Sequence, residues 1–219
     1  IVRRVAYARQ LAVGAVLGVV IAAGSSRPAL AVIGEAGVGV GVDLNAGADT
    51  LATLQFSDGS TQDIKAGNGL LLTLGGGIIL FEQQRHRLEA VLDVGLKYST
   101  MQPSQNADLS FVRVPIELLA FYRNDDAHFR VGAGGAYYPY SSLSGSGAAS
   151  NLQLDFKPAL GAVVEGDFLW GRGYLGIRYT YLSYSVSGSS SSAAASSLGF
   201  TLGFSYQFES RPPPPASPP

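Results

Sequence analysis

The sequence predicts an all-β protein with the architecture of an eight-stranded antiparallel up-and-down transmembrane β-barrel. Three observations carry this prediction. Large apolar residues alternate with small or polar residues along every long segment, which is typical of strands with two unlike faces. The segments are about 10 residues long or longer, which suits a tilted strand crossing a bilayer, whereas soluble strands usually have about 5 or 6. The connections alternate between short and long, as in outer-membrane barrels.

Residues 198–208 show the alternation most clearly, because large apolar residues occupy the even positions and small or polar residues the odd ones. Pro115 and Pro158 fall within two of the other segments, and proline cannot donate a ladder hydrogen bond. We therefore expect a bulge or a shifted strand end at each proline. Seven segments besides 198–208 alternate in this way: 36–45, 70–81, 88–98, 111–122, 129–140, 152–168 and 174–186.

The connections between these segments are of two kinds. With both chain ends in the periplasm, the long loops would face the outside. The first long loop is expected to contain a hairpin, since residues 50–56 and 61–65 flank the turn sequence Ser57-Asp58-Gly59-Ser60. Short turns are expected at 83–87, 123–127 and 171–173, and four long loops at 46–69, 99–110, 141–150 and 187–197.

The first residues have the pattern of a cleavable signal peptide. Arg3, Arg4 and Arg9 precede an apolar stretch, and Ala29-Leu30-Ala31 offers small residues for cleavage. The stretch is short for a membrane-spanning helix, which needs about 20 residues, so an uncleaved anchor is the less favoured alternative. The predicted organisation is a signal peptide at 1–31, an outer-membrane β-barrel at 32–208 and a proline-rich periplasmic tail at 209–219.

Composition excludes several functions. Loss of the four arginines in the signal peptide would leave 11 basic against 16 acidic residues, which argues against a nucleic-acid partner because that would require a basic face. The absence of cysteine excludes disulfides, thiolate catalysis and thiolate metal sites. The two histidines, His86 and His128, fall beside short turns and are interpreted as solvated. No metal and no cofactor is therefore expected.

Parity along the strands assigns a set of charged residues to the inward face. One interpretation is an ion path or a carboxylate pair, with Glu165 and Asp167 two positions apart. The favoured interpretation is a structural network of salt bridges, because an eight-stranded barrel is only just wide enough for its own side chains. The candidate lumen residues are Asp43, Glu89, Asp93, Lys97, Arg113, Glu117, Arg130, Asp155, Lys157, Glu165, Asp167 and Arg178.

Glycines and aromatic residues fit the same architecture. The glycines of 37–41 and of 75–77 are interpreted as small inward residues that leave room for larger neighbours. Aromatic residues near predicted strand ends are expected to form interfacial belts. The belt residues are Phe81, Tyr98, Phe111, Phe121, Tyr122, Tyr137, Tyr138, Tyr140, Phe168, Trp170, Tyr174, Tyr179, Tyr181, Tyr184, Tyr206 and Phe208.

With its closing strand ending Phe204-Ser205-Tyr206-Gln207-Phe208, the sequence over 32–208 resembles the small eight-stranded outer-membrane barrels of the OmpA and OmpX type. The resemblance implies a monomer in the outer membrane of a Gram-negative-type envelope, surrounded by outer-membrane lipids and lipopolysaccharide. It also implies that the barrel-assembly machinery recognises Phe204, Tyr206 and Phe208 as an assembly signal.

No catalytic motif accompanies the resemblance. The leading hypothesis is a non-enzymatic integral outer-membrane protein that presents four extracellular loops, with an envelope-structural role or an extracellular ligand bound by the loops. The alternative is a narrow porin that passes small solutes through a polar lumen. A lipid-modifying enzyme is least favoured, because neither His86 nor His128 lies near the predicted outer end.

Overall fold

The computed structural model describes residues 33–55, 61–104, 107–147, 152–187 and 192–209. The predicted signal peptide and all but the first residue of the predicted tail lie outside these ranges. Over the described residues the fold is all-β, with twelve strands and no helix: β1 Ile33–Asn45, β2 Thr50–Gln55, β3 Thr61–Lys65, β4 Gly69–Gln83, β5 His86–Ser104, β6 Ala107–Asn124, β7 Phe129–Gly147, β8 Gln153–Asp155, β9 Ala159–Trp170, β10 Gly173–Ser185, β11 Ser192–Ala194 and β12 Ser197–Glu209.

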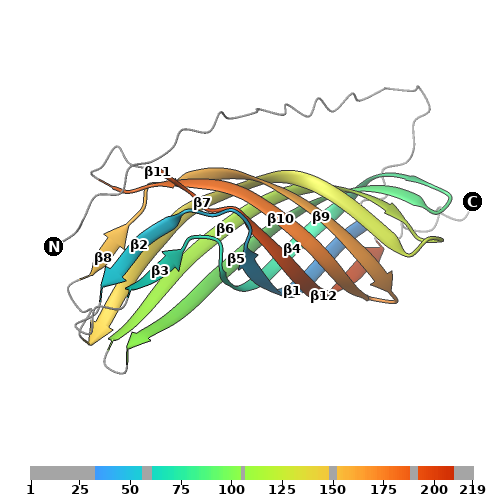
Figure 1. Cartoon of the computed structure of the whole chain (residues 1–219). Coiled ribbons are helices and arrows are strands. Elements are labelled where there is room, and N and C mark those ends of the chain that lie inside the picture. Colours follow the sequence, from blue (N-terminus) through green and yellow to red (C-terminus); the bar gives the residue numbers. More distant parts are fainter. Residues whose placement is uncertain (1–32, 56–60, 105–106, 148–151, 188–191, 210–219) are drawn as a thin grey trace, which may run out of the picture. The chain divides into compact units, whose positions relative to one another are not determined.

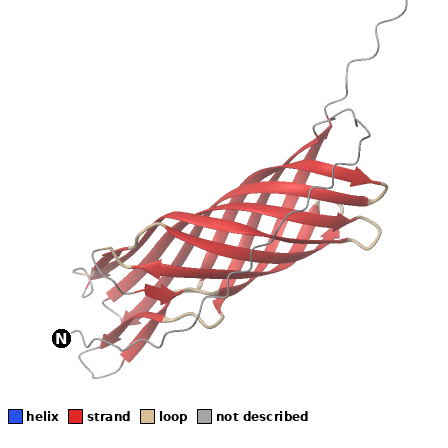
Figure 2. Ribbon diagram, turned by 90° about the horizontal axis from the view of Figure 1, so that it is seen from above, coloured by secondary structure: helices blue, strands red, loops and turns tan. Residues whose placement is uncertain are grey.

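Eight of these strands form a closed antiparallel barrel, which confirms the predicted fold class. In order around the barrel they are β1, β4, β5, β6, β7, β9, β10 and β12, and the pairing of β12 with β1 closes the ring. The strands run obliquely around the barrel (Figures 1 and 2). Closure leaves these eight strands without a free edge, so their backbone groups pair within the wall.

Side-chain parity follows the predicted alternation. In β12 the even residues from Leu198 to Phe208 are exposed on the outer surface, whereas Ser197, Gly199 and Thr201 are buried inside. Because successive strand residues point to opposite faces, β12 has an apolar outer face and a small or polar inner face.

The two ends of the barrel differ. At one end, here called the turn end, short connections join β4 to β5, β6 to β7 and β9 to β10, and β1 begins opposite the last residue of β12. The tight connections require left-handed backbone, with φ of 56° at Gln84 and 57° at Gly171. The opposite end, here called the loop end, carries β2, β3, β8 and β11. The predicted hairpin is confirmed as the pair β2–β3, although its turn lies outside the described residues.

Several strands extend further than predicted. β5 runs to Ser104, β6 begins at Ala107 and β7 runs to Gly147, so the predicted loops 99–110 and 141–150 are wrong over most of their length. The predicted loop 187–197 likewise contains β11, which pairs with β10. The backbone ladder continues there although the alternation of apolar and polar residues fades.

Both predicted proline irregularities are present. At Pro115 the register between β6 and β7 shifts, because Val114 pairs with Tyr140 but Ile116 pairs with Tyr137. At Pro158 the predicted single strand 152–168 is divided into β8 and β9. The break also reverses parity: Phe156 is buried, and Asp155 and Lys157 are exposed.

Candidate functional site

The barrel lumen brings together most of the charged residues predicted to face inward. At mid-barrel, Arg178 on β10 pairs with Glu117 on β6, and its Nη1 lies 3.5 Å from Oε2 of Glu165 on β9. Thr201 on β12 donates a hydrogen bond of 3.1 Å to the same Glu165. The three charged side chains are almost completely buried. This cluster therefore connects β6 with β9, β10 and β12 across the lumen.

A second ion pair lies in the same layer. The Nε of Arg130 on β7 donates to Oδ2 of Asp167 on β9 at 2.6 Å. The guanidinium group also stacks between two aromatic rings, 4.4 Å from the centroid of Phe121 and 4.4 Å from that of Tyr174. Cation–π contacts of this kind favour the charged form inside a desolvated site.

Closer to the loop end, Lys97 on β5 and Asp43 on β1 form a buried ion pair of 2.5 Å. Lys97 also donates a hydrogen bond of 3.3 Å to the hydroxyl group of Ser197. The pair spans β4, which lies between β1 and β5 in the wall. Its carboxylate and ammonium groups therefore connect strands that do not pair through their backbones.

Arg113 on β6 has a different role from that of its charged neighbours. Its Nη1 donates to the carbonyl oxygen of Ala66 at 2.7 Å, and its Nη2 donates to the carbonyl oxygen of Asn68. Its guanidinium lies 4.2 Å from the centroid of the Phe111 ring. No carboxylate among the described residues forms an ion pair with Arg113, so this side chain holds the segment after β3 against the barrel.

The loop-end half of the lumen is filled by an apolar cluster, here called the plug. Tyr184 packs edge-on against Phe111, with ring centroids 5.9 Å apart, and edge-on against Tyr138 at 6.0 Å. Phe156 contacts Phe111 and Tyr184, each at 5.4 Å. Ala66 and Leu143 are also fully buried in this cluster. The plug therefore occupies the lumen near the loop end, and the ion pairs occupy it at mid-barrel.

Glycines in neighbouring strands make room for the inward side chains. A Cβ atom added to Gly199 would lie 1.9 Å from Oδ1 of Asp43, its cross-strand partner. One added to Gly176 would lie 1.8 Å from Oδ1 of its partner Asp167. These carboxylates therefore lie flat across a glycine of the next strand. The inward glycines of β1 and β4 similarly line a cavity of about 40 Å³, as predicted, but the inward placement of Gly76 was wrong because it lies on the exposed outer face.

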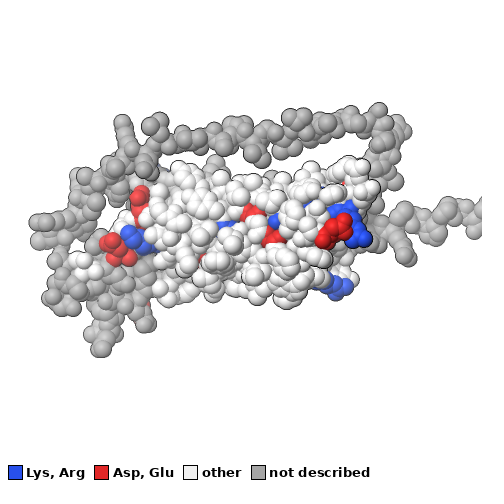
Figure 3. Space-filling view, turned by 45° about the vertical axis from the view of Figure 1, so that its right-hand side comes forward, with Lys and Arg blue, Asp and Glu red and all other residues white. Residues whose placement is uncertain are grey.

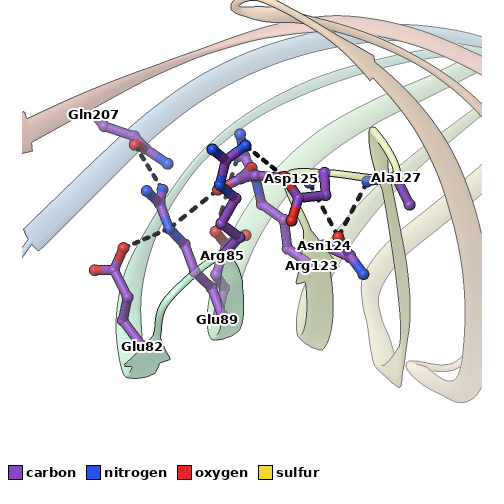
Figure 4. Close-up of polar contacts among 10 residues, drawn as sticks. Glu82, Arg85, Glu89, Arg123, Asn124, Asp125, Ala127 and Gln207 are labelled. Carbon is purple, nitrogen blue, oxygen red and sulfur yellow. Dashed lines mark hydrogen bonds and ion pairs between the residues drawn. The ribbon is translucent and has the colours of Figure 1, made fainter.

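The turn end carries a separate polar network, part of which is drawn in Figure 4. Arg87 contacts Glu82 at 2.9 Å and also donates to Gln207 at 3.0 Å. Arg123 pairs with Asp125 at 2.6 Å and lies 3.9 Å from Glu89. Nearby, the backbone N–H groups of residues 126 and 127 donate to Oδ1 of Asn124, which closes the β6–β7 turn.

The twelve candidate lumen residues fall into three groups. Nine are buried inside the barrel and Asp93 is half-buried at the cavity wall. The inward placement of Asp155 and Lys157 was wrong, because the break at Pro158 reverses the parity before it. The buried nine are Asp43, Glu89, Lys97, Arg113, Glu117, Arg130, Glu165, Asp167 and Arg178.

The predicted aromatic belt was partly wrong. Phe111, Phe121, Tyr138 and Tyr184 are buried, and Tyr174 turns inward to contact Arg130. These rings have the same parity as the inward charged residues of their strands. Their inward position could therefore have been predicted from the sequence. Glu35, a further inward acid, was also missed. The remaining predicted belt residues are exposed: Phe81, Tyr98, Tyr122, Tyr137, Tyr140, Phe168, Trp170, Tyr179, Tyr181, Tyr206 and Phe208.

The outer surface of the barrel is apolar. Leu160 is 78% exposed and Leu74 is 70% exposed, which would be costly for so many large apolar side chains in water. On the face shown in Figure 3, charged residues gather mainly near the ends, and only a small group interrupts the uncharged surface between them. No helix within the described ranges is long and apolar enough to span a membrane.

A closed barrel of eight antiparallel strands, with an apolar exterior and a charged interior, is the architecture of the small outer-membrane barrels. Neisserial surface protein A is similar in structure, with 13% identity, a TM-score of 0.44, and coverage of 79% of this chain and 96% of its own. The attachment invasion locus protein Ail of Yersinia pestis, in complex with the heparin analogue sucrose octasulfate, has 10% identity, a TM-score of 0.45, and coverage of 81% and 100%.

The outer-membrane protein AlkL, solved by solid-state NMR in lipid bilayers, has 16% identity, a TM-score of 0.37, and coverage of 90% of this chain and 99% of its own. These likenesses concern the fold alone. No protein-family model matches the sequence, and no curated protein is similar to it.

Proposed function

We propose that this chain is a non-enzymatic integral outer-membrane protein whose barrel is a closed anchor for structure at its loop end. The observation that carries the proposal is the combination of an apolar exterior with a lumen filled by ion pairs and by the plug. An anchor in a membrane needs an apolar exterior, and in the described part of the chain the plug and the ion pairs occupy the lumen between the cavity and the loop end.

The proposal places the chain among outer-membrane lipids and lipopolysaccharide, as a monomer assembled by the barrel-assembly machinery. The exposed outward rings of Phe204, Tyr206 and Phe208 at the end of β12 are available for recognition as the assembly signal. The extracellular partner would be met by β2, β3 and the extensions of β5, β6 and β7.

Planar-bilayer recording distinguishes the closed anchor from the narrow porin, because only the porin would conduct ions. Purified, folded protein is reconstituted into a planar bilayer, and current is recorded at a series of voltages. We expect no stepwise conductance. Regular steps that scale with salt concentration would overturn the closed anchor and favour the porin.

The lipid-modifying alternative has its own test. Unchanged lipid A and phospholipid profiles on overexpression are expected for a protein without lipid-modifying activity.

Orientation can be tested cleanly because the sequence contains no cysteine. The variants D108C and D126C each introduce one thiol, at an exposed position of the loop end and of the turn end respectively. Intact cells are treated with a membrane-impermeant maleimide. We expect labelling of D108C only, with D126C labelled after the outer membrane is permeabilised. Labelling of D126C alone in intact cells would reverse the proposed orientation.

A further inference from the structure

Two acidic side chains in the turn-end half of the lumen have no cationic partner. Glu35 on β1 is only 9% exposed, and its Oε2 has no hydrogen-bond partner. Asp93 on β5 is half-buried. Within the described ranges neither carboxylate takes part in a hydrogen bond or an ion pair. Burying a carboxylate without a counter-charge is costly, so this arrangement points to a missing positive charge.

The two carboxylates face the same cavity of about 40 Å³. Between them in the wall lies β4, where Gly77 pairs with Glu35 and Gly75 pairs with Asp93. A Cβ atom on Gly75 would lie 1.7 Å from Oδ1 of Asp93, so that carboxylate lies directly across the glycine. Gly75 and Gly77 of β4 thus leave space beside Asp93 in a cavity that Glu35 also lines.

Neutral oxygen atoms complete the lining of this cavity. The hydroxyl groups of Thr73 and Tyr174 converge above Gly39, since a Cβ atom added there would lie 2.7 Å from each oxygen. Thr201 and Ser205 also line the cavity. Carboxylate, hydroxyl and water oxygens are the ligands that hard divalent cations prefer.

The cationic side chains at this cavity are already engaged. Arg130 is paired with Asp167, and Arg178 is paired with Glu117 and Glu165. Neither guanidinium forms an ion pair with Glu35 or Asp93. Because Arg178 is shared between two carboxylates, the acids at this cavity outnumber the cations, and a bound divalent cation would reduce that excess.

The cavity adjoins a wider pocket at the turn end. A wider pocket of about 440 Å³ at that end is lined by Arg123, Gly171, Arg172, Ser205, Tyr206 and Gln207. Ser205 lines both spaces. Towards the loop end, the ion-pair layer and the plug fill the lumen. The turn end is therefore the expected side for an ion to enter.

We propose that this cavity binds one hard divalent cation, Ca²⁺ or Mg²⁺, through the carboxylates of Glu35 and Asp93. In the described part of the chain no three acidic or histidine side chains are grouped closely enough to hold a metal by themselves. Hydroxyl groups and water would therefore complete the coordination, as is usual for Mg²⁺ and common for Ca²⁺. The inference is independent of the proposed anchoring function.

The test uses full-length folded protein in detergent after treatment with a chelator. Urea or thermal unfolding is measured with and without Ca²⁺ or Mg²⁺, and Tb³⁺ binding is followed by emission excited through tyrosine, for which Tyr174 is placed at the cavity. The variants are E35Q and D93N. The matched control is D108N, which removes an exposed acid at the loop end.

We expect the divalent cations to raise the unfolding midpoint of the wild type and of D108N. The affinity of E35Q and D93N should fall by more than about tenfold, with Tb³⁺ emission reduced to match. No cation-dependent shift in the wild type, or an equal shift in E35Q and D93N, would overturn the proposal. If the variants are more stable than the chelated wild type and no cation has an effect, the two acids are simply held protonated. Slower gel migration after boiling verifies that each variant is folded.

Discussion

Glycine and carboxylate residues occur as cross-strand pairs in this lumen. Asp43 lies across Gly199, and Asp167 lies across Gly176. In an eight-stranded barrel the interior is only just wide enough for side chains, so a long polar side chain needs a neighbour without one. The glycine content is therefore a packing requirement of the charged layer, and each glycine fixes where its partner's carboxylate can lie.

A methyl group at Gly176 should destabilise the barrel, whereas one at Gly166 should not. In G176A the added Cβ would lie 1.8 Å from Oδ1 of Asp167, while at Gly166 no atom lies within 4 Å. We expect G176A to cost about 1–3 kcal/mol through overpacking and G166A to be neutral or stabilising by up to about 1 kcal/mol. Urea unfolding of both proteins in lipid vesicles measures the difference. Equal stabilities would contradict the packing argument.

The buried pair of Lys97 and Asp43 should show strong coupling. K97M leaves Asp43 buried without its cation, and we expect a loss of about 3–5 kcal/mol, as when one partner of a buried ion pair is removed. The double variant D43N/K97M removes both charges and should be clearly more stable than K97M alone. The unfolding free energies of D43N, K97M and the double variant D43N/K97M give the coupling free energy between the two side chains. The exposed K157M is the control, with a change within about 0.5 kcal/mol.

Strand parity alone predicted that most of these charged residues face the lumen. Once one residue of a strand is known to face inward, the direction of every other side chain in that strand follows. Arg178 and Tyr184 lie on the same strand at even positions, and both face inward. Parity failed at Asp155 and Lys157, because it does not survive the break at Pro158. Partner choice was not predictable at all: the pairing of Lys97 with Asp43 depends on register and on the curvature of the closed wall.

At the scale of elements, the strands β5, β6 and β7 are longer than a bilayer requires. They have 19, 18 and 19 residues, whereas about 9–11 residues suffice for a tilted strand to cross. The surplus lies at the loop end, where Ser110 and Ser144 on adjacent strands contact each other at 2.9 Å. The sequence predicted loops here because polar residues occupy both faces, although the backbone pairing continues.

Arg113 should control how firmly the first long connection is held. Arg113 donates two hydrogen bonds from β6 to this segment, to the carbonyl groups of Ala66 and Asn68. We expect R113M to increase amide hydrogen exchange across residues 46–69, because local opening needs fewer contacts to break. Exchange followed by mass spectrometry measures this. Exchange in the turn between β4 and β5, at the opposite end of the barrel, is the internal control, and an unchanged rate in 46–69 would contradict the expectation.

At the scale of the whole barrel, two kinds of interior are stacked along the axis. The turn-end half is polar and contains the cavity, whereas the loop-end half is sealed by the plug around Phe111 and Tyr184. Together with the short turns at one end, this gives the barrel a wet side and a sealed side. A protein that only anchors needs such a seal to keep the membrane impermeable.

The outer face should behave as a lipid-contacting surface whose sensitivity depends on depth. Leu202 lies near the middle of β12 and Phe208 near its turn end, and both are exposed, at 42% and 53%. We expect L202R to cost about 2–4 kcal/mol of folding free energy in lipid vesicles and F208R about 0–1 kcal/mol, because the charge at the midplane cannot reach the interface. Reversible urea titrations in vesicles measure both values. A soluble barrel would show no such gradient, since the two positions are similarly exposed, and equal costs would therefore contradict the placement of β12 across a bilayer.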